Sequence, residues 1–201
     1  LTAENSTSGD IILTNIAPTA AGLTITTSAV PYLTGVQNYG GSVSITENSP
    51  ITISAPVFAT GDITLIADDS AGSDDGSITN NATVTSSGGD VNFYAGTDIN
   101  IGADIQAADT LNLFADDSTV ASNNSTGTGS VVRTSGTIIA PAINLTGVNI
   151  GTSANPIVTD AGTLSASAGS GSTTGGVYIS ELNQIALDDI STYDGDREIN
   201  A

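Results

Sequence analysis

Residues 89–101 read GDVNFYAGTDINI, and this stretch decides the fold. Apolar and polar side chains alternate over 91–93 and again over 99–101, which is the period of a β-strand with one buried face. Glycines stand before the first of these strands and between the two. Because no part of the chain shows the 3.6-residue period of an α-helix over a useful length, the pattern predicts short strands joined by tight corners.

The apolar–polar–apolar triplet at 91–93 recurs at a nearly constant interval. Three of the intervals are 20 residues and one is 21, and the other two equal 20 plus insertions of 8 and 12. Stacked repeats of this length share a core, because each repeat covers the open face of its neighbour. We therefore predict that the first residues of the triplets form one interior column. They are Leu23, Val43, Ile63, Val91, Leu111 and Ile143, with Leu164 as a weaker seventh member.

Second triplets lie between the first ones, for example at 51–53 and 177–179. Two or three short strands per coil indicate an all-β fold, a parallel β-helix (β-solenoid) with about 20 residues per coil and loop insertions. Eight or nine coils about 4.8 Å apart would give a rod on the order of 40 Å long. A β-sandwich also accounts for short alternating strands with frequent turns, although the regular interval favours the solenoid.

The chain is interpreted as one solenoid domain over 1–201. Regular coils are expected over about 22–180, and 181–201 is expected to form a cap or a junction between subunits. The two insertions lie within 68–77 and 116–129, where Asp, Ser, Asn and Gly predominate, the composition of solvated loops. A solenoid tolerates such loops because they can leave one coil without disturbing its neighbours.

Glycine and proline mark the corners before the triplets. Gly41, Gly61, Gly89 and Gly162 all stand two residues ahead of a first apolar position. We predict that they supply the positive φ of a tight corner, which glycine adopts readily. Pro141 takes the equivalent place in another coil, since proline cannot lie inside a central ladder and so marks a bend.

Charge and composition narrow the range of partners. The chain has 21 acidic and two basic residues, a net charge of -19, which argues against nucleic acid because phosphate binding uses clustered Lys and Arg. No run of about 18 apolar residues could span a bilayer, so no membrane insertion is expected. High charge with few aromatic residues also fits disorder, but β-branched residues alternate with polar ones here, which favours a folded chain.

Catalysis is constrained by residue types that the chain lacks. Without His, Cys or Lys there is no Ser-His-Asp, Cys-His or Ser-Lys arrangement and no Schiff base. A hydrolase could still use two carboxylates, but the visible Asp pairs lie among Ser and Gly with no aromatic residue nearby to hold a sugar ring. We therefore expect a protein that is not an enzyme. The pairs are Asp68-Asp69, Asp74-Asp75, Asp116-Asp117 and Asp188-Asp189.

Calcium is the cofactor that the acidic loops suggest. Carboxylates and loop carbonyls are the hard oxygen ligands that Ca²⁺ prefers, and both insertions would bring theirs together if they left the same corner. A second acidic group lies near the end of the chain. Neither group matches an EF-hand loop or the Gly-Gly-x-Gly-x-Asp calcium repeat, and solvated surface acids are the competing interpretation. The candidate ligands are Asp68, Asp69, Asp74, Asp75, Asp116, Asp117, Asp194, Asp196 and Glu198.

Residues 89–101, with the strands that follow at 103–105 and 111–113, resemble the repeat of filamentous-haemagglutinin-like adhesins and related large bacterial exoproteins. In that family a glycine precedes an apolar–polar–apolar strand, an Ala-rich corner follows, and a second strand begins after Asp. The resemblance is clearest over 41–115 and looser over 131–180. It implies a right-handed β-helix on the outside of a bacterium, used as a stalk, an adhesin shaft or a filament. The chain has no recognisable secretion domain.

Two functions follow as expectations. The first is an extracellular, non-catalytic structural or adhesive rod in a bacterial surface fibre, joined head to tail to itself or forming part of a longer chain. The second is a module that binds surface glycans or another cell surface through the polar residues on the outer strand face. The row expected to form that face is Thr24, Ser44, Thr64, Asn92, Asn112 and Asn144.

Overall fold

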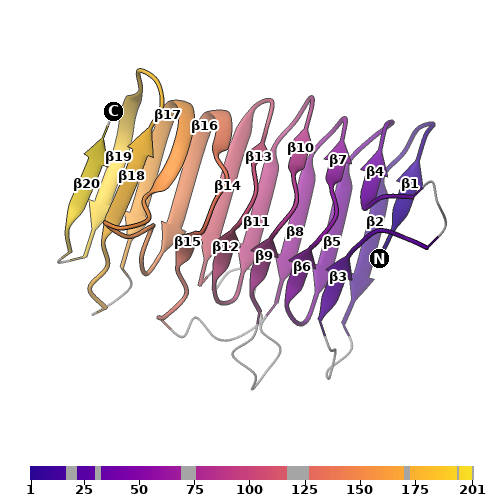
Figure 1. Ribbon diagram of the computed structural model, residues 1–201, viewed down its shortest axis with the longest axis horizontal. Coiled ribbons are helices and arrows are strands. Elements are labelled where there is room, and N and C mark those ends of the chain that lie inside the picture. Colours follow the sequence, from indigo (N-terminus) through magenta and orange to yellow (C-terminus); the bar gives the residue numbers. More distant parts are fainter. Residues whose placement is uncertain are drawn as a thin grey trace.

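The computed structural model describes residues 1–16, 22–29, 33–68, 76–116, 127–169, 173–193 and 195–200. Within these ranges the chain forms strands β1 to β20 and no helix, and every pair of strands is parallel. Figure 1 shows the strands stacked side by side from the N-terminal end to the C-terminal end along the longest axis of the molecule. The chain is therefore a parallel β-helix, as predicted. The right-handedness of the helix stays a prediction.

Each of the first five turns, which we call rungs, contributes one strand to each of three faces. Face A carries β1 (Ala3–Asn5), β4 (Val36–Asn38), β7 (Val57–Ala59), β10 (Val84–Ser86) and β13 (Ile105–Gln106). Face B carries β2 (Ile11–Asn15), β5 (Val43–Glu47), β8 (Ile63–Ala67), β11 (Val91–Ala95) and β14 (Thr110–Ala115). Face C carries β3 (Leu23–Ile25), β6 (Ile51–Ile53), β9 (Ile78–Asn80), β12 (Ile99–Ile101) and β15 (Val131–Arg133).

Longer strands close the stack at its C-terminal end. β16 (Ile138–Gly147) and β17 (Ile157–Ala168) each run along face A and then face B, so these two faces merge into one 15-stranded sheet while face C remains a separate 5-stranded sheet. β18 (Val177–Glu181) passes from face C to face A, β19 (Ala186–Thr192) lies on face B, and β20 (Arg197–Asn200) stacks on β18 from Val177 to Ser180. No helix that could cross a membrane occurs in the described ranges.

The core consists of columns in which like residues stack over one another. Alternation turns every second side chain inward, and the inward residues of the middle strands are almost fully buried Val, Ile, Leu and Ala, with Phe93 as the single ring among the buried core residues of the described chain. The first inward column of face B runs from the first rung to β17, and Leu187 of β19 continues its register with 52% of its surface exposed. Its members are Ile11, Val43, Ile63, Val91, Leu111, Ile143, Leu164 and Leu187.

One member of the predicted column is wrong. Leu23 belongs to face C, where it stacks on Ile51, and Ile11 takes the place under Val43. All three faces carry the same alternation, so a triplet on face C that happens to precede Val43 by one regular coil length looks like a rung of face B. The true interval, from Ile11 to Val43, is the long one that recurs between Leu111 and Ile143.

The corner glycines are required by close stacking and not by positive φ. Gly41, Gly61, Gly89 and Gly162 all lack the positive φ that we predicted for them. A Cβ on Gly61 would lie 2.5 Å from Ser42 Oγ, and one on Gly162 would lie 2.8 Å from the carbonyl oxygen of Pro141. A Cβ atom cannot lie this close to another atom without a shift of the structure. Glycine is therefore needed at these corners, because the rung beneath leaves no room for a side chain.

Oxygen-bearing side chains link the rungs at the corner between faces A and B. Asp10 Oδ1 accepts a hydrogen bond from the Ser42 N–H (2.8 Å), and Ser42 Oγ accepts one from the Asp62 N–H (3.0 Å). Asp62 Oδ1 in turn accepts from the Asp90 N–H (2.9 Å), and Asp90 Oδ1 from the Thr110 N–H (2.9 Å). Several acids of this chain are therefore structural, because each one satisfies a backbone N–H of the next rung.

Candidate binding surface on face B

Two outward rows run side by side along face B. The first, here called the amide row, joins the central positions of neighbouring rungs, and the second, the aromatic row, lies two residues further along each strand. The amide row is Ser44, Thr64, Asn92, Asn112, Asn144 and Ser165. The aromatic row is Thr46, Ile66, Tyr94, Phe114, Thr146 and Ser167.

The amide row is connected by side-chain hydrogen bonds between rungs. Asn112 Nδ2 donates to Asn92 Oδ1 (2.7 Å), Asn144 Nδ2 donates to Asn112 Oδ1 (2.8 Å), and Asn92 Nδ2 lies 3.5 Å from Thr64 Oγ1. In each asparagine the side-chain amide is therefore oriented by a hydrogen bond to a neighbouring rung. The amide can form further hydrogen bonds on its solvent side. Such a row can offer donors and acceptors at the spacing of the rungs, about 4.8 Å.

The aromatic row puts rings on the outside of a chain that has few of them. The Tyr94 and Phe114 rings, on adjacent rungs, have centroids 5.6 Å apart and an interplanar angle of 64°, an edge-to-face pair. Ile66 continues the apolar row on the preceding rung, and all three side chains keep part of their surface exposed. In the sequence, each of these three residues is followed by an alanine. They are seen to point outward only when inward and outward positions are counted from the first residue of each strand.

A shallow hollow adjoins these rows toward the C-terminal end of face B. It has a volume of about 180 Å³, with Phe114 at one side and hydroxyl, amide and carboxylate groups around it. An apolar ring next to fixed polar groups is the composition of a site for a small polar ligand with an apolar face, such as a sugar ring. The polar lining residues are Asn144, Thr146, Ser165, Ser167, Asp189 and Ser191.

The predicted outward row is correct from Ser44 to Asn144 and wrong at Thr24. Thr24 lies on face C, where it is in register with Thr52, and Thr52 with Thr79. The error has the same origin as that at Leu23, since both residues belong to one triplet. The outward row of face B begins instead with Ile12, which is 72% exposed.

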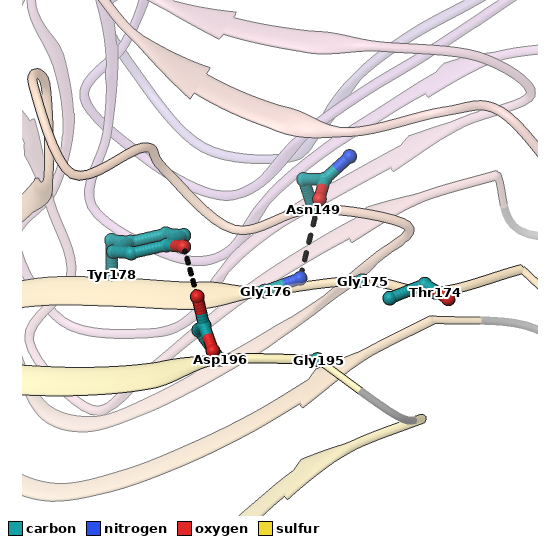
Figure 2. Close-up of a pocket in the computed structure, with 7 residues that line it drawn as sticks. All are labelled: Asn149, Thr174, Gly175, Gly176, Tyr178, Gly195 and Asp196. Atoms are coloured by element: carbon teal, nitrogen blue, oxygen red, sulfur yellow. Dashed lines mark hydrogen bonds between the residues drawn. The ribbon is translucent and has the colours of Figure 1, made fainter.

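A second pocket lies at the C-terminal end of face C, with a volume of about 270 Å³ (Figure 2). Asn149 Oδ1 accepts a hydrogen bond from the Gly176 N–H (3.2 Å), and the Tyr178 hydroxyl donates to Asp196 Oδ2 (3.5 Å). Partial burial raises the pKa of the Tyr178 phenol, and the negative charges of Asp196 and Glu198 together with the hydrogen bond to Asp196 add to the increase. The phenol is thus held in its neutral form.

The described candidates for calcium do not gather at one place. Asp68 and Asp116 leave the same corner between faces B and C, because Ala67 and Ala115 share a column, but β11 separates their rungs. Two rung steps are about 10 Å, whereas ligands of one Ca²⁺ lie about 2.3–2.6 Å from it. Asp116 also accepts the Gly127 N–H through both carboxylate oxygens (3.2 and 3.1 Å).

Near the end of the chain, Asp196 accepts from Tyr178 and Glu198 Oε1 from Asn200 Nδ2 (3.2 Å). The described ranges contain no group of three or more His, Cys, Asp or Glu residues close enough to hold a metal ion. The other candidates lie outside the described residues, so the calcium site stays a prediction. They are Asp69, Asp74, Asp75, Asp117 and Asp194.

Two glutamates occupy inward columns, which the sequence reasoning missed. Glu47 is fully buried and accepts hydrogen bonds from Asn15 Nδ2 and Ser49 Oγ, both 2.8 Å. Glu181 is 6% exposed and accepts from Thr159 Oγ1 at 2.7 Å. The signal was available for Glu47, since it is two residues past Ile45 on the same alternating strand. Both carboxylates are hydrogen-bonded, as buried charged groups must be.

No family model, curated protein or solved structure matches the chain. The resemblance to filamentous-haemagglutinin-like adhesins therefore stays a prediction from the residues that carry it.

Proposed function

We propose that the chain is a non-catalytic, extracellular structural rod that forms part of a bacterial surface fibre. The observation that carries this proposal is the continuous stacking of parallel strands from β1 at Ala3 to β20 at Asn200. Each rung shares backbone ladders and buried columns with its neighbours, so a load on one rung is distributed over many hydrogen bonds. A solenoid of this kind provides length and stiffness by repeating one short structural unit.

Composition supports the external location. The chain has no Lys and a net charge of -19, and from Ser44 to Ser165 its amide row consists of Ser, Thr and Asn, which keep a long rod soluble. The resemblance of 89–113 to the repeats of bacterial exoproteins points the same way. Calcium bound by the acidic loops would be a cofactor of the rod and not of a reaction.

Two measurements test this proposal. Antibodies against the chain should label intact cells of its source, with permeabilised cells as the comparison; labelling that requires permeabilisation would contradict the external location. Small-angle scattering of the purified chain should give the profile of an elongated particle at every salt concentration. A compact sphere would contradict the rod.

The surface of face B supports a second function, the binding of neutral glycans. Tyr94 and Phe114 offer an apolar platform beside Asn92 and Asn112, which is how a protein holds the apolar face of a sugar ring while bonding its hydroxyls. Acidic glycans are disfavoured by the charge of the chain. This function is compatible with the rod, because the surface is repeated along it.

Calorimetric titration with neutral oligosaccharides tests the binding function. Tyr94→Ala and Phe114→Ala should each weaken binding by at least about tenfold, equivalent to about 1.4 kcal/mol. Phe58→Ala is the matched control, because Phe58 is an outward ring on face A that pairs with Tyr39 at 5.3 Å between centroids. Equal losses in all three variants, or no binding by the native chain, would contradict a site on face B.

A further inference from the structure

The hollow on face B extends along the rod across four neighbouring strands, β14, β16, β17 and β19 (Figure 1). Phe114 is in register with Thr146, and Thr146 with Ser167. Ser167 is in register with Ser191, so the lining of the hollow crosses three rung steps. Three steps of about 4.8 Å amount to about 14 Å. A ligand that contacts both ends of the hollow is therefore extended along the rod and longer than a single sugar ring.

A β-bulge brings one carboxylate into this hollow. The register between β17 and β19 shifts between Leu164 and Ala166. At this shift two residues of β19, Asp188 and Asp189, stand opposite Ser165 alone. Bulges re-aim side chains, and they are common beside functional sites. Asp189 lines the hollow, and it is the one charged residue among the described residues that do so.

The two carboxylates of the bulge differ in their surroundings. Asp188 Oδ2 accepts a hydrogen bond from Ser165 Oγ at 3.3 Å and does not line the hollow. The chain has no Lys, and neither of its two arginines is on face B, since Arg133 belongs to β15 and Arg197 to β20. A cationic group in the hollow therefore meets the Asp189 carboxylate without a competing basic side chain from this face.

Electrostatics favour a positively charged group beside Asp189. The net charge of -19 attracts cations to the surface and repels acidic glycans. A hydrogen bond from an ammonium group to a carboxylate is shorter and about twice as strong as one between neutral groups. A sugar hydroxyl is only a neutral donor. Among glycans, those with a free amino group therefore gain the most from this carboxylate.

The rest of the lining favours a sugar over a metal ion or a lysine side chain. Ca²⁺ takes about six to eight oxygen ligands, and the described residues include no group of three or more acidic side chains close enough to hold a metal. A lysine side chain would use the carboxylate and leave the other polar groups unmatched. Thr146 and Ser167 offer hydroxyl groups on successive rungs beside Asn144, which suits a ligand with hydroxyls along its length.

We propose that the hollow on face B binds a linear oligosaccharide with free amino groups, with one ammonium group at Asp189 and a sugar ring against Phe114. The hydroxyl groups between these two contacts lie along Thr146 and Ser167. This inference rests on the glycan-binding function proposed above, and it names the class of glycan as one that contains amino sugars without an acyl group.

Calorimetric titration with two oligosaccharides of equal length tests the inference. One is a glucosamine tetramer, whose amino groups are free, and the other is its fully N-acetylated counterpart, which is neutral. At mildly acidic pH the native chain should bind the glucosamine tetramer at least about tenfold more tightly, because a hydrogen bond to a charged partner contributes more than a neutral one. This preference should disappear as the pH rises and the amino groups lose their protons. A preference that persists in alkaline solution would contradict a role for the ammonium group.

Asp189→Asn removes the charge and keeps the size of the side chain. It should abolish the preference for the glucosamine tetramer and leave binding of the neutral tetramer unchanged. Asp188→Asn is the matched control, because it lies in the same bulge, changes the net charge equally, and can still accept from Ser165. The control should keep the preference of the native chain. An equal loss in both variants would overturn the inference, since net charge alone would then account for it.

The remaining outcomes separate this inference from the proposed function. Equal binding of the two tetramers overturns the inference and leaves the glycan-binding function in place. Binding of the glucosamine tetramer alone, dependent on Asp189, contradicts only the preference for neutral glycans, and binding of neither tetramer contradicts both. A short lysine peptide of the same positive charge is the competing ligand, and tighter binding of this peptide than of the glucosamine tetramer would also overturn the inference.

Discussion

At the residue scale, the corners between faces A and B depend on a small residue that makes room for a side-chain oxygen. The Gly89 position lies against Asp62, whose carboxylate accepts the Asp90 N–H, and a Cβ on Gly89 would fall on that carboxylate. The requirement is steric, since φ at Gly89 is not positive. At these corners the glycine leaves room for the side-chain oxygen of the rung beneath. The Asp or Ser that follows the glycine presents an oxygen to the next rung, so the two residues act together.

Gly89→Ala should lower the free energy of unfolding by about 1–3 kcal/mol, because the carboxylate of Asp62 must move and release its hydrogen bond. Combining it with Asp62→Ala should cost less than the sum of the two single changes. Asp104→Ala is the control partner, since Asp104 accepts the Thr137 N–H (2.8 Å) at a different corner. Urea denaturation measures all of these variants, and additive energies for Gly89 and Asp62 would contradict the steric account.

Tyr178 provides a pH-dependent prediction. Burial and the nearby charges of Asp196 and Glu198 raise the pKa of its phenol. A raised pKa in the folded chain means that any contribution to stability is complete below the ordinary phenol pKa and is lost as pH rises through the folded value. Asp196→Asn should lower the pKa of Tyr178, as followed by NMR of the ring carbons during titration. A pKa that rises or does not change would contradict the interaction with Asp196.

At the element scale, outward side chains stabilise the stack as well as the inward ones. Asn112 both donates to Asn92 and accepts from Asn144. Asn112→Ala removes both hydrogen bonds and should reduce the free energy of unfolding by about 1–2 kcal/mol. Asn100→Ala on face C is the control, because the described structure gives its side chain no hydrogen bond, and it should cost less. Thermal unfolding distinguishes the two, and equal effects would argue against a stabilising row.

Alternation is sufficient to predict the strands, the fold class and most of the register. Val43, Ile63, Val91 and Leu111 form the predicted column because only an alternating strand buries both of its apolar residues on one face. Alternation does not say which face a triplet belongs to, and that is why the prediction for Leu23 is wrong.

The outer surface is harder to predict than the core. The polar row from Ser44 to Asn144 follows directly from alternation. The Tyr94–Phe114 pair and the buried Glu47 are also fixed by alternation, but ring contacts and hydrogen-bond partners between rungs depend on three-dimensional register. The calcium ligands depend on loop conformation, which no periodicity encodes.

At the scale of the whole molecule, the stack behaves as a one-dimensional array in which each rung is stable only through its neighbours. Full burial of one Val, Leu or Ile side chain stabilises a fold by about 1.5–3 kcal/mol, and every middle rung contributes several such residues. The stability of each middle rung is therefore shared with the rungs on either side of it.

The central claim is the register of the rungs, and pairs of cysteines introduced into this cysteine-free chain test it most directly. Thr14 and Thr46 are outward residues in register on adjacent rungs, whereas Thr24 and Ser44 lie on different faces although they are closer together in the sequence. Adjacent parallel strands lie about 4.8 Å apart, within the range of Cα separations that a disulfide can bridge. Mild oxidation should therefore form an intramolecular disulfide in Thr14→Cys/Thr46→Cys and none in Thr24→Cys/Ser44→Cys. A disulfide in the second pair and not in the first would contradict the stacking described here.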